Sequence, residues 1–157
     1  MTALLYAQHG AAVGVLGPFA LCTADGPSAF SPITARRVVS EIERLRRTSH
    51  RSRLVYVYVV AEDANLPDHE TRKIVAEVAQ HVDAVIGIHE GTGFRASVVR
   101  GMITSINLLA RQRLRPIIFA SVGEAVEHLE RRSPELGAKR LFEALASVRA
   151  QGRRAAA

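Results

Sequence analysis

The residues best suited to chemistry lie between Asp83 and Arg111. An apolar run, 84–88, leads into the turn His89-Glu90-Gly91-Thr92-Gly93, and an amphipathic segment begins at Phe94. This is the pattern of a strand, a glycine-rich turn and a helix in an α/β sheet. Because such a turn exposes backbone N–H groups at the start of a helix, it could hold an anion such as a phosphate, a nucleotide or an acyl carboxylate.

Three predicted loops should meet at one edge of the sheet, because the carboxyl ends of parallel strands lie side by side. Histidines and carboxylates at such an edge could bind a metal or transfer protons, while solvated loops and helix caps explain the same residues without chemistry. No ligand spacing is diagnostic, so we predict no metal site, no catalytic residue and no cofactor, and assign the edge to ligand or partner binding. The candidate residues are Asp63, Asn65, Asp68, His69, His89, Glu90, Gly91, Thr92, Gly93, Arg95, Arg100 and Ser121.

Other motifs point away from familiar enzyme classes. Gly91-x-Gly93-x-x-Ala96 matches the letters of a dinucleotide fingerprint, but no acidic residue stands about twenty positions further on. The motif also follows the fourth predicted strand instead of the first, which favours a tight turn that needs glycine. Cys22 has no neighbouring base to activate it, and no Gly-x-Ser-x-Gly pattern occurs.

Composition restricts the class of protein and of partner. At 157 residues with 48% hydrophobic residues, the chain is expected to bury its own core. A net charge of +6 favours acidic partners, while an aromatic content of 5% makes nucleic acid a less suitable partner. No basic residue precedes the apolar N-terminal segment, and no apolar run has the length of a membrane span. We therefore expect a cytoplasmic protein without a membrane partner.

The elements that must position these residues follow from the apolar pattern. Short apolar runs, 4–7 and 12–16, flank Gln8-His9-Gly10-Ala11 and predict a hairpin. Further strands are expected at 54–60, 83–88 and 116–120, in the order β-β-α-β-α-β-α-β-α-α. This order predicts an α/β fold, in which a mixed sheet of about five strands has an N-terminal hairpin followed by parallel βα units. Helices pack on that sheet, one extra helix follows at the C-terminus, the domain covers 1–150, and 151–157 forms a disordered tail.

Helix caps and helix faces are also predicted. The sequence places Ser31, Asp68, Ser121 and Ser133 at the N-caps of four helices. The helix from Phe94 to about Arg113 should bury one face and expose the other. Its buried face would hold Phe94, Val98, Met102, Ile106 and Leu109, and its exposed face Arg100, Thr104, Asn107 and Arg111.

Two segments carry a resemblance to a known family. Residues 93–100 (GFRASVVR) and 119–129 (FASVGEAVEHL), together with the element order, resemble the STAS fold of the anti-sigma-factor antagonists, in an uncharacterised bacterial branch. The resemblance covers roughly 4–129 and implies a small module that docks a partner protein, sometimes under control of phosphorylation. The phosphorylatable turn of the antagonists corresponds here to 62–68, which has no hydroxyl, and Thr71 is the nearest candidate.

These observations lead to three functional hypotheses. The first is a non-enzymatic, STAS-like interaction or regulatory module in a bacterial cytoplasm, which binds another protein and could also form a homodimer through an exposed helix face. The second is a small-ligand protein that binds an anion in the Gly91–Arg95 turn. The third is an enzyme that uses His69, His89 and Glu90 at the sheet edge.

Overall fold

The predicted N-terminal hairpin is confirmed in a computed structural model, which describes residues 1–50, 52–111 and 114–157. Strands β1 (Ala3–Gln8) and β2 (Ala11–Leu16) pair antiparallel. The two residues between them, His9 and Gly10, have φ angles of 51° and 85°. Positive φ at both positions is what a tight two-residue hairpin turn requires, because its twist then matches that of the strands.

A third strand, which sequence reasoning missed, continues the hairpin. Strand β3 (Phe19–Ala24) pairs antiparallel with β2 and parallel with β4 (Val55–Val60). Among the described residues the sheet therefore has six strands, in the order β1-β2-β3-β4-β5-β6, where about five were predicted. The predicted α/β class is confirmed, with its N-terminal hairpin, later parallel strands and C-terminal helix.

Helices connect the parallel strands. They are α1 (Pro32–Thr48), α2 (His69–Ala76) with a 3₁₀ extension η1 (Glu77–Gln80), α3 (Gly93–Leu109), α4 (Val122–Arg132) and α5 (Ala138–Arg154), with β5 (Ala84–His89) and β6 (Ile117–Phe119) between them. Three of the predicted caps are confirmed. The side chains of Ser31, Asp68 and Ser121 accept hydrogen bonds from the N–H groups three residues later, at 3.1, 2.7 and 3.3 Å.

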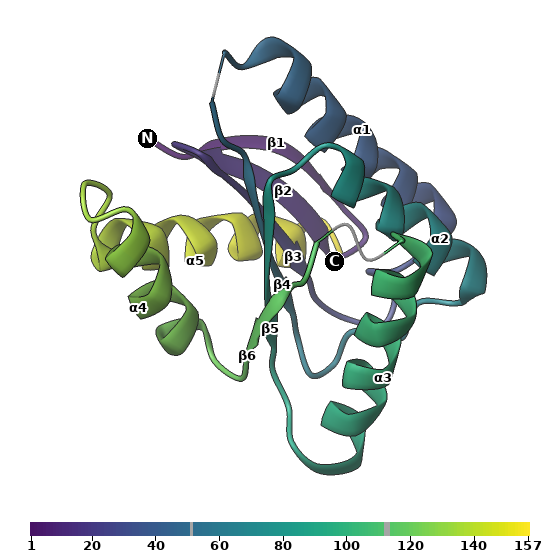
Figure 1. Cartoon of the computed structure of the whole chain (residues 1–157). Coiled ribbons are helices and arrows are strands. Elements are labelled where there is room, and N and C mark those ends of the chain that lie inside the picture. Colours follow the sequence, from purple (N-terminus) through teal and green to yellow (C-terminus); the bar gives the residue numbers. More distant parts are fainter. Residues whose placement is uncertain (51, 112–113) are drawn as a thin grey trace.

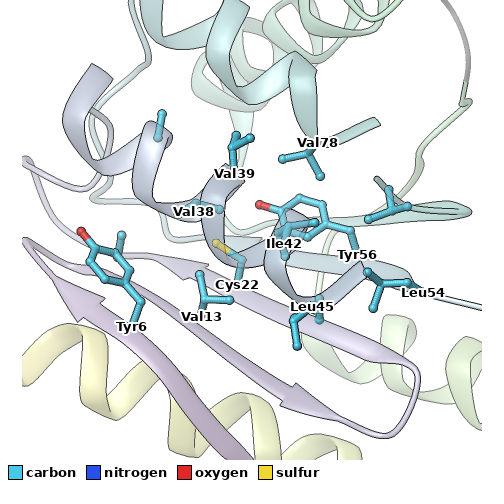
Figure 2. Packing of buried hydrophobic residues seen from close by; sticks show 14 of the residues in the cluster. Tyr6, Val13, Cys22, Val38, Val39, Ile42, Leu45, Leu54, Tyr56 and Val78 are labelled. Carbon is cyan, nitrogen blue, oxygen red and sulfur yellow. The ribbon is translucent and has the colours of Figure 1, made fainter. Parts of the chain in front are cut away.

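The sheet separates two apolar layers. Helices α1, α2 and α3 lie on one face, and α4 and α5 on the other (Figure 1). Alternation along β4 sends Val55, Val57 and Val59 toward α5, while Tyr56 belongs to the layer under α1, as predicted. Figure 2 shows this second layer, in which Tyr56 and Cys22 rise from the sheet toward α1.

The C-terminal helix differs from its prediction at both ends. It begins at Ala138, after Gly137 with a φ of 71°, and Ser133 ends α4 instead of capping α5. It continues through Arg154, beyond the boundary at residue 150 after which a disordered tail was predicted. The helix packs tightly on the hairpin, because a Cβ atom at Gly14 would come within 2.5 Å of Val148.

The predicted burial of α3 is wrong at both ends of the helix and partly right between them, where Val98, Met102 and Ile106 are half-buried. Of the apolar residues on this helix only Val99 is buried, while Phe94 is 85% exposed and Leu109 is exposed as well. The helix packs beside α2 and leaves its outer side uncovered (Figure 1). The helix ends at Leu109. Its predicted end, at about residue 113, lies outside the described residues.

The hairpin turn should be intolerant of a side chain at Gly10. A Cβ atom there would lie 2.0 Å from the carbonyl oxygen of Asp25, in a left-handed conformation. We expect Gly10→Ala to lower the free energy of unfolding by about 3 kcal/mol, from conformational strain and steric overlap together. Gly26, at a φ of 81° with no atom within 4 Å of its added Cβ, is the control. Urea unfolding of Gly26→Ala should show a loss of only about 1 kcal/mol, and equal losses would contradict the steric explanation.

Candidate functional site

The carboxyl ends of β4 and β5 meet at one edge of the sheet, as predicted, and the carboxyl end of β3, a strand that was not predicted, lies beside them. The Ala61 N–H donates to the Ala24 carbonyl at 2.9 Å, and the Glu90 N–H donates to the Val60 carbonyl at 3.0 Å. The Arg95 guanidinium also donates to the Ala64 carbonyl. The loop after β4 and the turn after β5 are therefore adjacent in space.

The glycine-rich turn is shaped by two residues with positive φ, Gly91 at 118° and Gly93 at 68°. Carboxylate-bearing side chains flank it, since Glu62 lies against Gly91 and Glu90 precedes it. The side chain of Thr92 makes no capping hydrogen bond to α3. The Glu62 carboxylate beside the turn, and an arginine already bonded to a carbonyl, make it a poorer anion site than the sequence suggested.

Most of the other predicted site residues hold loops and helix ends together. Asp63 accepts from the Gly26 N–H at 3.1 Å, and Asn65 exchanges two hydrogen bonds with the Phe30 backbone, at 2.8 and 2.7 Å. Asp68 caps α2, and the hydrogen bond from the Thr71 N–H lowers the pKa of its carboxyl. These interactions fix the loop after β4 against the loop that precedes α1.

The remaining predicted residues lie apart from this edge or make no contact across it. His69 is exposed at the start of α2, and Arg100 is exposed on α3, 3.3 Å from the Ser97 hydroxyl. Ser121 caps α4. Thr71, the nearest candidate for phosphorylation, is buried, so a kinase does not reach it in the folded chain.

His89 and Glu90 are neighbours in sequence but belong to different sites, because successive strand residues point to opposite faces. The ring of His89 faces Tyr58, with its Nε2 atom 3.0 Å from the tyrosine hydroxyl. Glu90 instead pairs with Arg149 of α5. The predicted cluster of His89 and Glu90 is thus divided by the sheet.

Sequence reasoning missed an ion-pair network on the α5 side. The Arg149 guanidinium donates to Asp25 Oδ1 at 2.8 Å and to Glu90 Oε2 at 2.9 Å, and Arg153 donates to the same Asp25 oxygen at 3.1 Å. Burial opposes the charge of Arg149, yet its hydrogen bonds to Glu90 and Asp25 raise its pKa. Recognising β3 would have placed Asp25 at the sheet edge, but no local pattern indicates Arg149 as its partner.

A cavity of about 130 Å³ lies on the other face, between the sheet and helices α1, α2 and α3. Its wall is mainly aliphatic, and no charged side chain contributes to it among residues 1–50, 52–111 and 114–157. The main polar feature is the Tyr58–His89 pair, whose rings meet edge to face at 5.3 Å. Burial lowers the pKa of His89 to about 4, so this imidazole is neutral at physiological pH.

The cavity wall also contains Cys22. Burial raises the pKa of its thiol to about 11, and burial raises the pKa of Tyr58 as well. A thiol with so high a pKa is almost entirely protonated at neutral pH and is a weak nucleophile. Within the described part of the chain, no three histidine, cysteine or carboxylate side chains are grouped as a metal site would require.

Comparison with known proteins gave no match to a family model, a curated protein or a solved structure. The resemblance to STAS proteins therefore stays a prediction. Among the residues that the structure describes, no helix combines the length and apolarity needed to cross a membrane.

Removal of Arg149 should leave the Asp25 carboxylate, which is only 3% exposed, with the exposed Arg153 as its remaining cation. We expect Arg149→Leu to lower the free energy of unfolding by about 3 kcal/mol. Arg153 contacts the same oxygen, but its side chain is 60% exposed against 19% for Arg149. Arg153→Leu should lower the free energy of unfolding by less than about 1 kcal/mol. Chemical denaturation of both variants measures the difference, and a similar small loss for each would argue against a dominant role for Arg149.

The buried His89 predicts a pH dependence of stability. Its pKa falls from 6.5 in the unfolded chain to about 4 in the folded chain. Between these values the unfolded chain binds a proton at His89 that the folded chain does not, so stability decreases as the pH falls from 6.5 to 4.

We expect His89→Asn to flatten the decrease in unfolding free energy between pH 7 and 4.5. This pH range lies above the one in which the carboxyl groups of Asp68 and Asp83 titrate, because their pKa values are lowered in the folded chain. His128 also has a pKa lowered first by burial, so His128→Asn measures its separate share. An unchanged slope for His89→Asn would show that this ring does not titrate as inferred.

Proposed function

We propose that this protein is a non-enzymatic binding module of the STAS type, which docks an acidic helix of another protein on the outer face of α3. The observation that carries the proposal is the exposure of large apolar side chains on this helix. Phe94 is 85% exposed and Leu108 is 58% exposed. The two side chains lie near opposite ends of α3 and share one face by helical spacing, as apolar anchors of an interaction surface would.

The outer face of α3 has the shape of a helix-docking surface. Helical spacing aligns Ser97, Gly101 and Ser105 between Phe94 and Leu108. A Cβ atom at Gly101 would meet no atom within 4 Å, so the backbone is open to solvent there. Glycine in a helix interior costs about 1 kcal/mol relative to alanine. An approaching helix could pack closely against this point, with the two large side chains as anchors on either side.

The charge of α3 favours an acidic partner. The helix has no Asp or Glu residue, and Arg100 is exposed on it. The whole chain has a net charge of +6. Apolar anchors beside arginine are typical of protein interfaces. Two copies of the chain that paired through Gly101 would bring their Arg100 side chains together, so a partner of opposite charge fits better than a homodimer.

The non-enzymatic part of the proposal has separate support. The polar side chains of the sheet edge cap helices, join loops or pair with each other, and the one cysteine carries a protonated thiol. The alternative of a small anion in the 91–95 turn has less support, because Glu62 lies against Gly91 and Arg95 is already bonded to the Ala64 carbonyl. A thermal-shift screen with phosphate and acetate tests that alternative directly.

The docking surface can be blocked without damage to the fold. We expect Gly101→Gln to keep or raise the melting temperature, because the added side chain meets open space and the helix gains propensity. The same variant should lose the bound partner in affinity capture with quantitative mass spectrometry. Phe94→Ala should weaken capture as well, since it removes an anchor side chain.

Phe142 on α5 provides the matched control, because it is another exposed phenylalanine on a helix. Phe142→Ala should capture the partner as the unaltered chain does. Captured proteins that are equally retained by all three variants would contradict docking on α3. If light scattering shows a dimer that Gly101→Gln disrupts, then the partner docked on α3 is a second copy of this chain and not an acidic helix of another protein.

A further inference from the structure

We propose that the cavity between the sheet and helices α1, α2 and α3 binds a small uncharged molecule, aromatic or aliphatic, that carries one hydrogen-bonding group. The site is distinct from the outer face of α3, and the inference does not rest on the proposed partner. Its basis is the size of the cavity, the chemistry of its wall and a buried polar atom without a partner.

The size of the cavity is suited to a molecule of about one ring. Its volume is about 130 Å³. An enclosed apolar cavity of about 150 Å³ in another protein takes up benzene, and the cavity here has a similar volume but is partly open to solvent. Because the wall here is mostly aliphatic, ordered water would find few partners in it. An apolar molecule can fill the same space and gain the contacts that an empty cavity lacks.

The wall selects against charge. No Asp, Glu, Lys or Arg side chain lines the cavity among the described residues. The low pKa of His89 keeps its ring neutral, so the ring offers no counter-charge to an anion. A carboxylate or an ammonium group would therefore be buried unpaired, at a large free-energy cost. We therefore expect the molecule bound in this cavity to be uncharged.

One end of the cavity is polar, and its geometry is specific. Tyr58 and Gly87 are cross-strand neighbours, and a Cβ atom at Gly87 would lie 2.5 Å from the tyrosine hydroxyl. The missing side chain thus makes room for Tyr58 to reach His89, with a hydroxyl-to-Nε2 distance of 3.0 Å. The arrangement is a fixed hydrogen-bonding pair in a mainly apolar wall, to which Thr34, Asn65 and Asn107 also contribute polar side chains.

The second ring nitrogen of His89 is the atom that lacks a partner. Within the described chain, Nδ1 is buried and makes no hydrogen bond. If the Tyr58 hydroxyl donates to Nε2, then Nδ1 carries the proton and can donate, and in the other tautomer Nδ1 can accept. A buried polar group without a partner is costly, so a ligand hydroxyl or carbonyl that reaches Nδ1 through a small shift of the cavity wall gains that free energy.

The inner face of α3 completes the wall. Val99, Met102 and Ile106 line the cavity from this helix, and only Val99 among them is buried. The helix lies at the rim of its layer, beyond α2 (Figure 1). Because α3 is packed on one side only, it can shift to fit a bound molecule. Helix α5 on the opposite face has less freedom, since it is in close contact with β2.

The experiment is a titration of the ¹⁵N-labelled full chain with toluene, phenol and benzoate at pH 7, followed by NMR. We expect toluene and phenol to shift amide signals of α3, β4 and β5, and benzoate to leave them unchanged. An absence of shifts with toluene and phenol up to their solubility would overturn the proposal. Shifts confined to α4 and α5, or benzoate binding as tight as that of phenol, would also overturn it.

Variants of two histidines test the polar end. In His89→Leu, the preference for phenol over toluene, expressed as the ratio of their Kd values, should fall about three- to tenfold relative to the unaltered chain, which corresponds to one hydrogen bond. His128 is the matched control, because its Nε2 atom is also buried without a partner in the described chain but lies on α4. His128→Leu should keep the ratio. An unchanged ratio in His89→Leu would overturn the role of this ring.

Discussion

The parallel pairing of β3 with β4 is the interaction on which the rest of the arrangement depends. It runs in register from Phe19 with Val55 to Ala24 with Val60. On its other side β3 pairs antiparallel with β2, so one strand joins the hairpin to the parallel half of the sheet. Because β3, β4 and β5 point the same way, Asp25, Ala61 and Glu90 follow their strands at one edge. Both the ion-pair network and the Tyr58–His89 pair depend on that common direction.

The two faces of the sheet differ in how tightly they are packed. On one face α5 lies against β2 so closely that Gly14 leaves no room for a side chain, and a buried ion pair ties Arg149 to Asp25. On the other face a cavity remains, and α3 buries a single residue. Regions with fewer buried contacts open more readily than the core. Both faces contain a buried core, and the part of the second face beside α3 has the features of a binding surface.

The sequence predicted the features that have a local signal. Alternation along 54–60 predicted which side chains of β4 face each layer, and Ser31, Asp68 and Ser121 were predicted as caps. Strand β3 was missed because Gly17-Pro18 indicates a break and the following run is rich in alanine, without the β-branched pattern of β4. Periodicity predicted the helix α3, but it identifies which residues share a face and not whether another element covers that face.

The site was only partly predictable for a similar reason. The meeting of the loops after β4 and β5 follows from strand direction, which the order of elements indicates. The pairing of Asp25 with Arg149 joins residues 124 positions apart, and no local pattern encodes it. A cavity is the space that remains after all side chains are in position, so it follows from the packing as a whole. Tyr58 and His89 were visible in the sequence, but their contact across Gly87 was not.

The long separation between Asp25 and Arg149 has a consequence for synthesis on the ribosome. While the chain is being translated, β3 and its carboxylate emerge well before α5 exists. The nascent sheet then has neither the helix that covers one of its faces nor the cation that compensates the Asp25 charge. Contacts so distant in sequence form late and slowly. Until the final helix is synthesised, the apolar face of the sheet that α5 covers therefore stays exposed.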